Sequence, residues 1–323
     1  MSKLGKLGKL GTGWRGSVGL MAAFAMLATA CGGDDTVEAG GGLSGTIEVD
    51  GSSTVEPLTA ALSEEYAIEQ PGVSIPISVS GTGGGFERFC TGQTAISNAS
   101  RPIAEDEVAA CEAAGVEFTE VRVGTDALTM ITNPATEFLD CLTTEEVATL
   151  WGPDAPATWN EVNADFPAEP IQVFAPDADS GTYDFFSETI LEEDVQPRQD
   201  YNSSADDNII VQGIQGTPGS WGFFGFAYFT NNAESLKAIA YDSGQGCVEP
   251  SVATAQDGSY GLTRPLFIYV NNAELSRPEV ADFVTYYLDN VSALIELIGY
   301  IPAPEEDLAQ SRAALEEAIS AAG

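Results

Sequence analysis

Three short stretches rich in serine, threonine and glycine each follow an apolar run and precede a predicted helix. A helix start presents unpaired backbone N–H groups and the positive end of the helix dipole, and side-chain hydroxyls add further donors. If the three stretches converge, the chemistry they support is the binding of a small oxyanion. The stretches are Gly51-Ser52-Ser53-Thr54 after residues 46–49, Gly81-Thr82-Gly83-Gly84-Gly85 after residues 73–79, and Asp179-Ser180-Gly181-Thr182 after residues 171–174.

A single stretch of this kind is also typical of an ordinary helix cap, because Ser and Thr are favoured at that position in any protein. Three such stretches in one chain favour a binding role over three unrelated caps. The sequence offers few cations as an alternative way of holding an anion.

The chain is strongly acidic. Its 323 residues include 12 lysines and arginines, 49 acidic residues and no histidine, which gives a net charge of −37. Lys3, Lys6, Lys9 and Arg15 lie within the first 30 residues, so the remainder has eight basic and 49 acidic residues, a balance of −41. Such a charge is typical of a highly soluble surface and repels nucleic acid, which we do not expect as a partner. An anion site in this chain must therefore be locally electropositive.

The sequence gives little support for catalysis. Without histidine, Ser-His-Asp and Cys-His arrangements are excluded. Beyond the first 30 residues the one lysine is Lys237, and residues 81–85 lack the Lys-Ser/Thr that completes a phosphate-binding P-loop. A hydrolase that uses two carboxylates stays open, although no distinctive motif accompanies any acidic pair. We expect a protein that is not an enzyme and that needs no cofactor.

The N-terminus predicts export. A basic segment ends near Arg15, an apolar stretch follows over residues 18–30, and this stretch is too short to span a bilayer comfortably. Cys31 follows Ala28-Thr29-Ala30, which is typical of a bacterial lipoprotein signal in which the cysteine becomes the lipidated first residue. We expect a signal peptide over residues 1–30 and a flexible linker over residues 31–44; the alternative is ordinary secretory cleavage with Cys31 as a bystander.

Four cysteines remain when Cys31 is set aside, and an even number suits an oxidising compartment. Four cysteines allow three connectivities, and we pair Cys90 with Cys111 and Cys141 with Cys247. No metal site is expected, because the chain has neither histidine nor a C-x-x-C motif.

Helical and strand patterns alternate along the chain, which predicts an α/β fold with parallel strands and crossover helices. Two extended apolar segments stand out as crossings between lobes, at about residues 126–133 and 265–271. They predict a first lobe from residues 45–127 and 273–323 and a second from 134–264, with the ligand at the interface. The aromatic run over residues 222–229 is interpreted as a buried strand, and a platform for stacking a sugar or a base is the alternative.

The chain resembles the PstS-type periplasmic phosphate-binding proteins, which are solute receptors of ABC phosphate importers. The resemblance covers essentially the whole chain after the signal peptide. It implies a type II periplasmic-binding-protein fold, the Venus flytrap, in which two α/β lobes joined by two hinge strands enclose phosphate. The matching stretches are GSSTVEPLTAAL (51–62), SGTGGGFERFCTGQTAISNASRPI (80–103), DADSGTYDFF (177–186), GSWGFFGFAYF (219–229) and GYIP (299–302).

Carried over position by position, the resemblance places the phosphate ligands in the same three stretches. The predicted binding residues are Ser53 and Thr54 from the first, Thr82, Gly83 and Gly84 from the second, and Ser180, Gly181 and Thr182 from the third.

Two positions depart from the best-known form of the family. Ala175-Pro176-Asp177 stands where that form has an arginine. Ser100, which we also include among the predicted binding residues, stands where that form has the acidic residue that accepts the proton of monohydrogen phosphate. We expect Arg101 to supply the cationic fork, with a surface salt bridge as the alternative role of this side chain. Asp179 is our candidate for the proton acceptor.

The expected function is that of an extracytoplasmic lipoprotein, in the periplasm or on the cell surface, anchored to the membrane through lipid on Cys31. It would capture inorganic phosphate between its lobes and deliver it to the transmembrane subunits of an ABC permease, and we expect a monomer. The alternatives are a receptor for molybdate, tungstate or sulfate, and a surface lipoprotein that senses phosphate.

Overall fold

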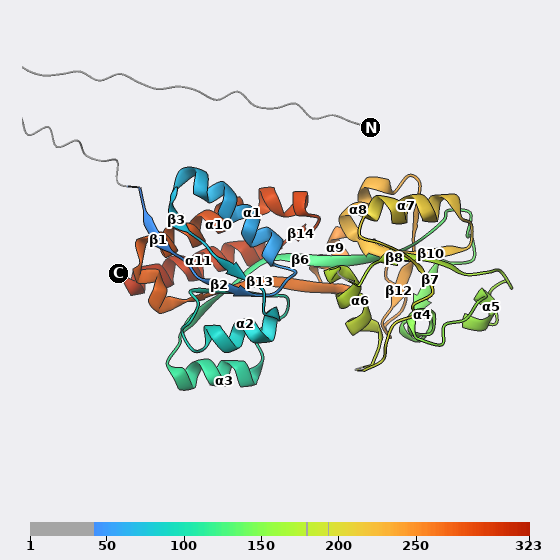
Figure 1. The fold of residues 1–323 in the computed structure, drawn as a ribbon, viewed down its shortest axis with the longest axis horizontal. Helices are drawn as coiled ribbons and strands as arrows, with labels where there is room; N and C mark the ends of the chain where they lie inside the picture. Colours follow the sequence, from blue (N-terminus) through green and yellow to red (C-terminus); the bar gives the residue numbers. More distant parts are fainter. Residues whose placement is uncertain (1–41, 179, 193) are drawn as a thin grey trace, which may run out of the picture. The chain divides into compact units, whose positions relative to one another are not determined.

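The computed structural model describes residues 42–178, 180–192 and 194–323, and Figure 1 shows its fold. The predicted signal peptide over residues 1–30, residues 31–41 of the predicted linker with Cys31, and the predicted proton acceptor Asp179 lie outside the described residues. Residues 42–323 form one compact unit.

A mixed sheet runs through this unit in the order β4-β2-β5-β13-β6-β10-β8-β9, with β11 and β14 also paired to β6. Its strands are β2 (Val49–Gly51), β4 (Ile77–Ser78), β5 (Ile96–Ala99), β6 (Phe118–Thr132), β8 (Gln172–Pro176), β9 (Asn202–Ser204), β10 (Ser220–Gly225), β11 (Lys237–Ala238), β13 (Thr263–Asn271) and β14 (Ile301–Pro302). Two smaller sheets pair β1 (Ser44–Thr46) with β3 (Gly72–Ser74) and β7 (Cys141–Thr143) with β12 (Ala240–Asp242).

The long strands β6 and β13 connect two halves of the sheet (Figure 1). Residues 118–127 of β6 pair antiparallel with β13, and residues 128–132 pair antiparallel with β10. Strands are parallel on either side, β2 with β4 and β5 in one half and β8 with β9 and β10 in the other. The prediction of parallel strands therefore holds within each half and is wrong for the crossing strands, because the chain leaves on β6 and returns on β13.

Each half has its own hydrophobic core, so the molecule has two lobes. On β6, Val123 belongs to the first core and Leu128 to the second; at the return crossing, Leu262 belongs to the second core and Leu266 to the first. The chain thus changes cores at the start of the two segments predicted as hinges. The predicted bounds of the lobes, residues 45–127 with 273–323 and residues 134–264, stay a proposal.

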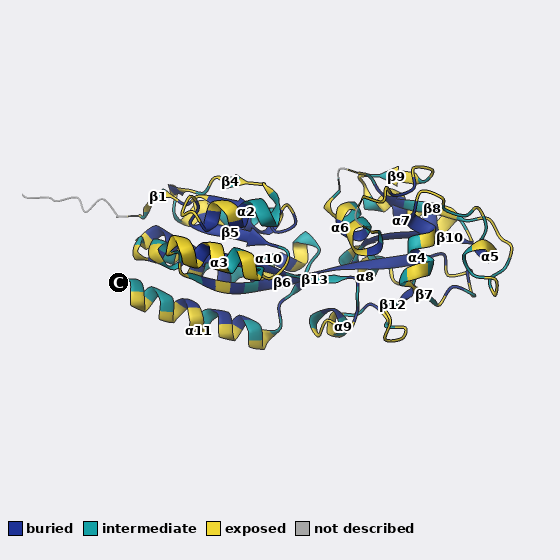
Figure 2. Ribbon diagram, turned by 90° about the horizontal axis from the view of Figure 1, so that it is seen from below, coloured by how far each residue is buried: buried dark blue, intermediate teal, exposed yellow. Residues whose placement is uncertain are grey.

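Helices cover the strands of both lobes, and Figure 2 shows buried strands between helices whose outer faces are exposed. The first lobe has α1 (Glu56–Glu69), α2 (Gly81–Phe89), α3 (Glu105–Ala114), the 3₁₀ helix η1 (Asn272–Ser276), α10 (Pro278–Ile298) and α11 (Glu305–Ala322). The second lobe has α4 (Thr144–Trp151), α5 (Trp159–Val162), α6 (Gly181–Ile190), α7 (Asp207–Gly216), α8 (Phe226–Asn232) and α9 (Val252–Gln256).

Two local expectations need correction. The run over residues 73–79 is split into β3 and β4 around Pro76, which has no N–H to donate. The aromatic run over residues 222–229 is a buried strand only as far as Gly225, and α8 begins at Phe226. Phe223 contributes to the second core, where its ring stacks on Phe186 with ring centroids 3.8 Å apart.

The structure contains two disulfides, Cys90–Cys111 and Cys141–Cys247, which are the pairs chosen from the sequence. Cys90–Cys111 joins the end of α2 to α3, and Cys141–Cys247 closes a long loop of the second lobe. Within the described ranges, no helix combines the length and the apolar character that a membrane crossing requires.

The long loop closed by Cys141–Cys247 gives a first prediction. The two cysteines are 106 residues apart, and on the loop-entropy model a bridge that closes about 100 residues contributes roughly 4–5 kcal/mol. The double variant Cys141→Ala, Cys247→Ala should lower the free energy of unfolding by about that amount in a guanidinium titration of the oxidised protein. In a reducing buffer, wild type should lose at least as much stability. A loss below about 1 kcal/mol in the double variant would show that the bridge does not constrain the unfolded chain.

Candidate functional site

A cavity of about 470 Å³ lies where residues of both lobes meet the start of β13. Six of the predicted binding residues line it: Ser53, Thr54, Thr82, Ser100, Arg101 and Gly181. The other lining residues that the structure describes are Ser52, Gly81, Asp184, Phe185, Glu188, Thr189 and Arg264. The cavity is therefore built from all three Ser/Thr/Gly stretches and from positions that the sequence analysis did not select.

The first stretch forms a turn between β2 and α1 instead of capping the helix. Helix α1 begins at Glu56 with Val55 as its N-cap, and the N–H of Thr54 donates to the hydroxyl oxygen of Ser52 at 3.2 Å. The helix thus follows the stretch, as expected from the sequence, and its N-cap is Val55 rather than a Ser or Thr of the stretch. Ser53 and Thr54 still line the cavity, but from the turn that precedes the helix.

The second stretch begins α2, and its position depends on Asp50. The carboxylate of Asp50 is fully buried, and its Oδ1 accepts hydrogen bonds from the N–H of Gly51 (2.7 Å) and from the N–H (3.0 Å) and hydroxyl (2.9 Å) of Ser80, the N-cap of α2. Arg88 donates to its Oδ2 at 2.5 Å. One carboxylate therefore fixes the first stretch to the start of the second.

Gly85 allows α2 to approach β2 closely, and Gly81 allows the backbone turn at the start of the helix. A Cβ atom on Gly85 would lie 2.5 Å from the Cα of Gly51, a distance at which the backbone would have to shift. Gly81, at the start of α2, has a φ of +79°, a conformation that favours glycine. These positions bring the start of α2 to the cavity wall.

Thr82 and Ser100 are linked across the wall of the first lobe. Their hydroxyl oxygens are 3.1 Å apart, and the N–H of Ser100, just after β5, donates to the hydroxyl oxygen of Thr82 at 3.2 Å. Ser100 thus presents a hydroxyl to the cavity, at the position where the best-known form of the family has a carboxylate.

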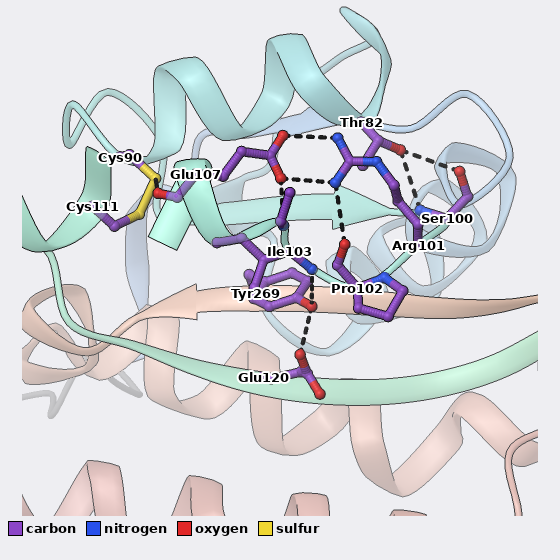
Figure 3. A network of polar contacts seen from close by, with 11 residues as sticks. Thr82, Cys90, Ser100, Arg101, Pro102, Ile103, Glu107, Cys111, Glu120 and Tyr269 are labelled. Carbon is purple, nitrogen blue, oxygen red and sulfur yellow. Dashed lines mark hydrogen bonds and ion pairs between the residues drawn. A yellow bond between two sulfur atoms is a disulfide. The ribbon is translucent and has the colours of Figure 1, made fainter. Parts of the chain in front are cut away.

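Arg101 lines the cavity and is also bound to Glu107, as Figure 3 shows. Both terminal nitrogens donate to the Glu107 carboxylate, at 2.7 and 2.8 Å. Although burial acts in the opposite direction, these bonds and one from the N–H of Ala104 hold the pKa of Glu107 below its ordinary value. The Arg101 fork predicted for the anion is therefore engaged by a carboxylate in this structure, which is the alternative role considered from the sequence.

The third stretch begins α6 in the second lobe. The hydroxyl oxygen of Ser180, its N-cap, accepts a hydrogen bond from the N–H of Thr182 at 3.2 Å. Gly181 lines the cavity, whereas Ser180 and Thr182 flank it. Asp184, Phe185 and Glu188 continue the lining along the same face of the helix.

Gly83 and Gly84 lie away from the cavity wall. Gly83 lines a different depression beside Phe86 and Glu107, and a Cβ atom on Gly84 would meet the Ser80 hydroxyl oxygen at 2.9 Å. The structure thus brings at least one residue of each predicted stretch to the cavity, but these two glycines do not line it.

Arg264 is the lining residue of greatest chemical interest that the sequence analysis missed. It lies on β13 directly opposite Asp126 of β6, and its Nε donates to the Asp126 Oδ2 at 3.0 Å. Its guanidinium lies 4.1 Å from the ring centroid of Phe185. Burial raises the pKa of Asp126 above its ordinary value, and Arg264 opposes that shift. In the sequence, each of these two charged residues stands just before the apolar run of a crossing strand. This position could have identified them as candidates for the site.

Comparison with known proteins places this architecture in a class. The model of the PBP superfamily domain matches residues 36–291. The SphX protein of Synechocystis is 43% identical over 268 residues, covering 81% of this chain and 80% of that protein. The phosphate-binding protein PstS of Staphylococcus saprophyticus is 36% identical over 298 residues and 91% of each chain.

A solved structure supports the same family assignment. The crystal structure of a possible phosphate binding protein from Planctomyces limnophilus is 43% identical, covers 85% of this chain and 99% of its own, and superposes with a TM-score of 0.82. PstS from Borrelia burgdorferi, at 21% identity and a TM-score of 0.63, shares the fold. The chain belongs to the PBP superfamily and, within it, to the family of the PstS-type phosphate-binding proteins.

The geometry of the site gives a second prediction, on Asp50. Asp50→Asn removes the negative charge to which Arg88 and Ser80 donate hydrogen bonds. It should therefore lower the free energy of unfolding by about 1–3 kcal/mol in a denaturant titration. Asp289→Asn is the matched control, because Asp289 is more than half exposed and pairs with Arg312 on the surface; it should cost about 0–1 kcal/mol. Equal costs for the two variants would contradict the central role of Asp50.

Proposed function

We propose that this protein captures inorganic phosphate in the cavity between its lobes and delivers it to the permease of an ABC transporter. The observation that carries the proposal is the composition of the cavity wall. It combines parts of three Ser/Thr/Gly stretches with Arg101 and Arg264, two of the eight basic residues found after residue 30. The relatives named phosphate-binding protein PstS support the choice of ligand and the kind of partner.

Hydroxyl and amide donors suit a dianion in so acidic a chain. Ser53, Thr54, Thr82 and Ser100 offer hydroxyls from the first lobe, and the start of α6 at Gly181 offers a helix N-terminus from the second. Hydrogen bonds to a charged group contribute ~1.5–3 kcal/mol net each, and micromolar binding requires only ~8 kcal/mol. Several such hydrogen bonds therefore suffice for micromolar binding, even after the entropy cost of ordering the site around the anion.

Both lobes contribute to the lining, so a bound anion would gain contacts when the lobes approach one another. A ligand shifts a conformational equilibrium by its difference in affinity for the two states. Phosphate would accordingly favour the closed form, and the closed form would be the one that the permease recognises.

The remaining features of the proposal concern the setting. Family membership supports a receptor, and we propose that the protein has no catalytic activity of its own. The position of Cys31 after small residues supports an extracytoplasmic lipoprotein anchored by lipid. We propose that it acts as a monomer.

Selectivity for phosphate over sulfate would come from a carboxylate that accepts the proton of monohydrogen phosphate. We propose that an aspartate at the start of α6 performs this role: Asp179, predicted from the sequence, or Asp184, which lines the cavity. Sulfate has no proton to donate, so its lone pair would face the carboxylate in a dry site. Sites built on such a mismatch discriminate by ~10⁴–10⁵.

Titration calorimetry of the purified, anion-free protein tests the function. Phosphate should bind with a Kd in the micromolar range or below, and sulfate and molybdate should bind far more weakly. A phosphate monoester incubated with the protein should be recovered uncleaved. Tight molybdate binding with weak phosphate binding would contradict the proposed ligand.

The selectivity proposal is tested with three variants. Asp179→Asn or Asp184→Asn should reduce the ratio of sulfate Kd to phosphate Kd by about 10²-fold or more, because an amide does not discriminate against sulfate as a carboxylate does. Glu192→Gln, which lies just after the end of α6 and outside the cavity lining, is the control and should leave the ratio within about threefold. If neither aspartate variant changes the ratio, the proton acceptor lies elsewhere.

A further inference from the structure

Two arginines line the cavity, and they differ in what they can offer an anion. Arg101 is bound by the Glu107 carboxylate through both terminal nitrogens, so its charge is largely balanced within its own lobe. Arg264 is held at Nε by Asp126, and this leaves the terminal nitrogens at the other end of the guanidinium. Among the described residues, the hydrogen bond of its Nη2 is to the Gly181 carbonyl oxygen at 3.4 Å, at the limit of a hydrogen bond. A phosphate oxygen would be the stronger acceptor.

The position of Arg264 is fixed by both crossing strands. Arg264 and Asp126 are directly paired residues of β13 and β6, and the side chains of both are largely buried, at 15% and 7% exposed. A guanidinium is planar and its Nε–H lies in the same plane as its terminal N–H groups. Fixing Nε on Asp126 therefore also sets the direction of the terminal pair.

The same guanidinium contacts the second lobe. It lies over the ring of Phe185, which lines the cavity and is 8% exposed, and it reaches the carbonyl of Gly181 at the start of α6. A cation stacked on an aromatic ring in this way is attracted to it. Arg264 thus connects the strands between the lobes with the helix that brings the second lobe to the anion.

We infer that Arg264 binds the anion through its terminal nitrogens and that Asp126 is the residue that positions it. This inference rests on the proposed function and names the cation of that site. Because Arg264 contacts β6 and α6 together, an anion that takes up its terminal N–H groups also favours one arrangement of the lobes. Arg264 thereby couples binding to closure.

The first experiment removes Arg264. Arg264→Gln should weaken phosphate binding by 10²-fold or more, and Arg264→Lys, which keeps the charge but not the planar fork, should recover only part of that loss. The matched control is Arg122→Gln: Arg122 lies on β6, the other crossing strand, pairs with Asp307 and lines a different depression. The control should bind phosphate within about threefold of wild type.

Asp126 gives a test whose sign is informative. Removal of a negative charge beside an anion site strengthens binding if the field alone matters, whereas it weakens binding if Asp126 orients Arg264. We expect Asp126→Asn to weaken phosphate binding by about tenfold. Tighter or unchanged binding in this variant would overturn the positioning role.

A double variant guards against misfolding, because Arg264→Gln leaves Asp126 buried without its cation. Arg264→Gln, Asp126→Asn replaces the ion pair by two amides of similar shape, and it should show the same loss of affinity as Arg264→Gln. Small-angle scattering should show a smaller phosphate-induced decrease in the radius of gyration for this variant than for wild type at saturation.

The outcomes separate this inference from the proposed function. If wild type binds phosphate and both the single and the double Arg264 variants match Arg122→Gln, the inference is wrong and the proposed function stands. If wild type does not bind phosphate, the proposed function is wrong and this inference is overturned with it.

Discussion

The antiparallel pairing of β6 with β13 is the constraint on which the rest of the structure depends. Both strands pass from one hydrophobic core to the other. On β6, for example, Val123 belongs to the first core and Leu128 to the second. Everything that lines the cavity is attached to this connection, either directly, as Arg264 is, or through a lobe that it carries. A change in the angle between the lobes therefore changes the distance between the hydroxyls of the first lobe and the helix start of the second. The site and the proposed closure of the lobes share one structural element.

In so acidic a chain, an anion site has to be built with few free cations. All eight basic residues after residue 30 pair with carboxylates in the described structure, so formal positive charge is used mainly to balance buried or partly buried acids. Asp50 shows the pattern: its charge organises the start of α2 and is itself compensated by Arg88. The donors that the cavity presents are hydroxyls, a helix N-terminus and the exposed part of two such ion pairs, and they lie alongside the carboxylates of Asp184 and Glu188. Donors of this kind suit an anion without requiring an electropositive surface around the whole molecule.

The sequence predicted the fold class because it depends on patterns that are local: the helical spacing that becomes α1, the glycine that ends α3 with a φ of +73°, and the apolar runs of the crossing strands. It also identified the three Ser/Thr/Gly stretches, of which Ser53, Thr82 and Gly181 meet in one cavity. It did not identify Arg264, because the partners of that side chain, Asp126 and Phe185, lie 138 and 79 positions away in the chain and meet it only after both crossings have formed. It also did not show that the first stretch forms a turn before α1, for a related reason: the N–H of Ser52 donates to the carbonyl of Asn98 on the neighbouring strand at 2.9 Å.

The central claim is that amide, hydroxyl and guanidinium groups from both lobes together enclose a tetrahedral dianion. A crystal structure of the protein grown with phosphate tests it most directly. The account predicts tetrahedral density within hydrogen-bonding distance of Ser53, Thr82, the start of α6 at Gly181 and the terminal nitrogens of Arg264. Tetrahedral density bound to one lobe alone, or outside the cavity that these residues line, would contradict it.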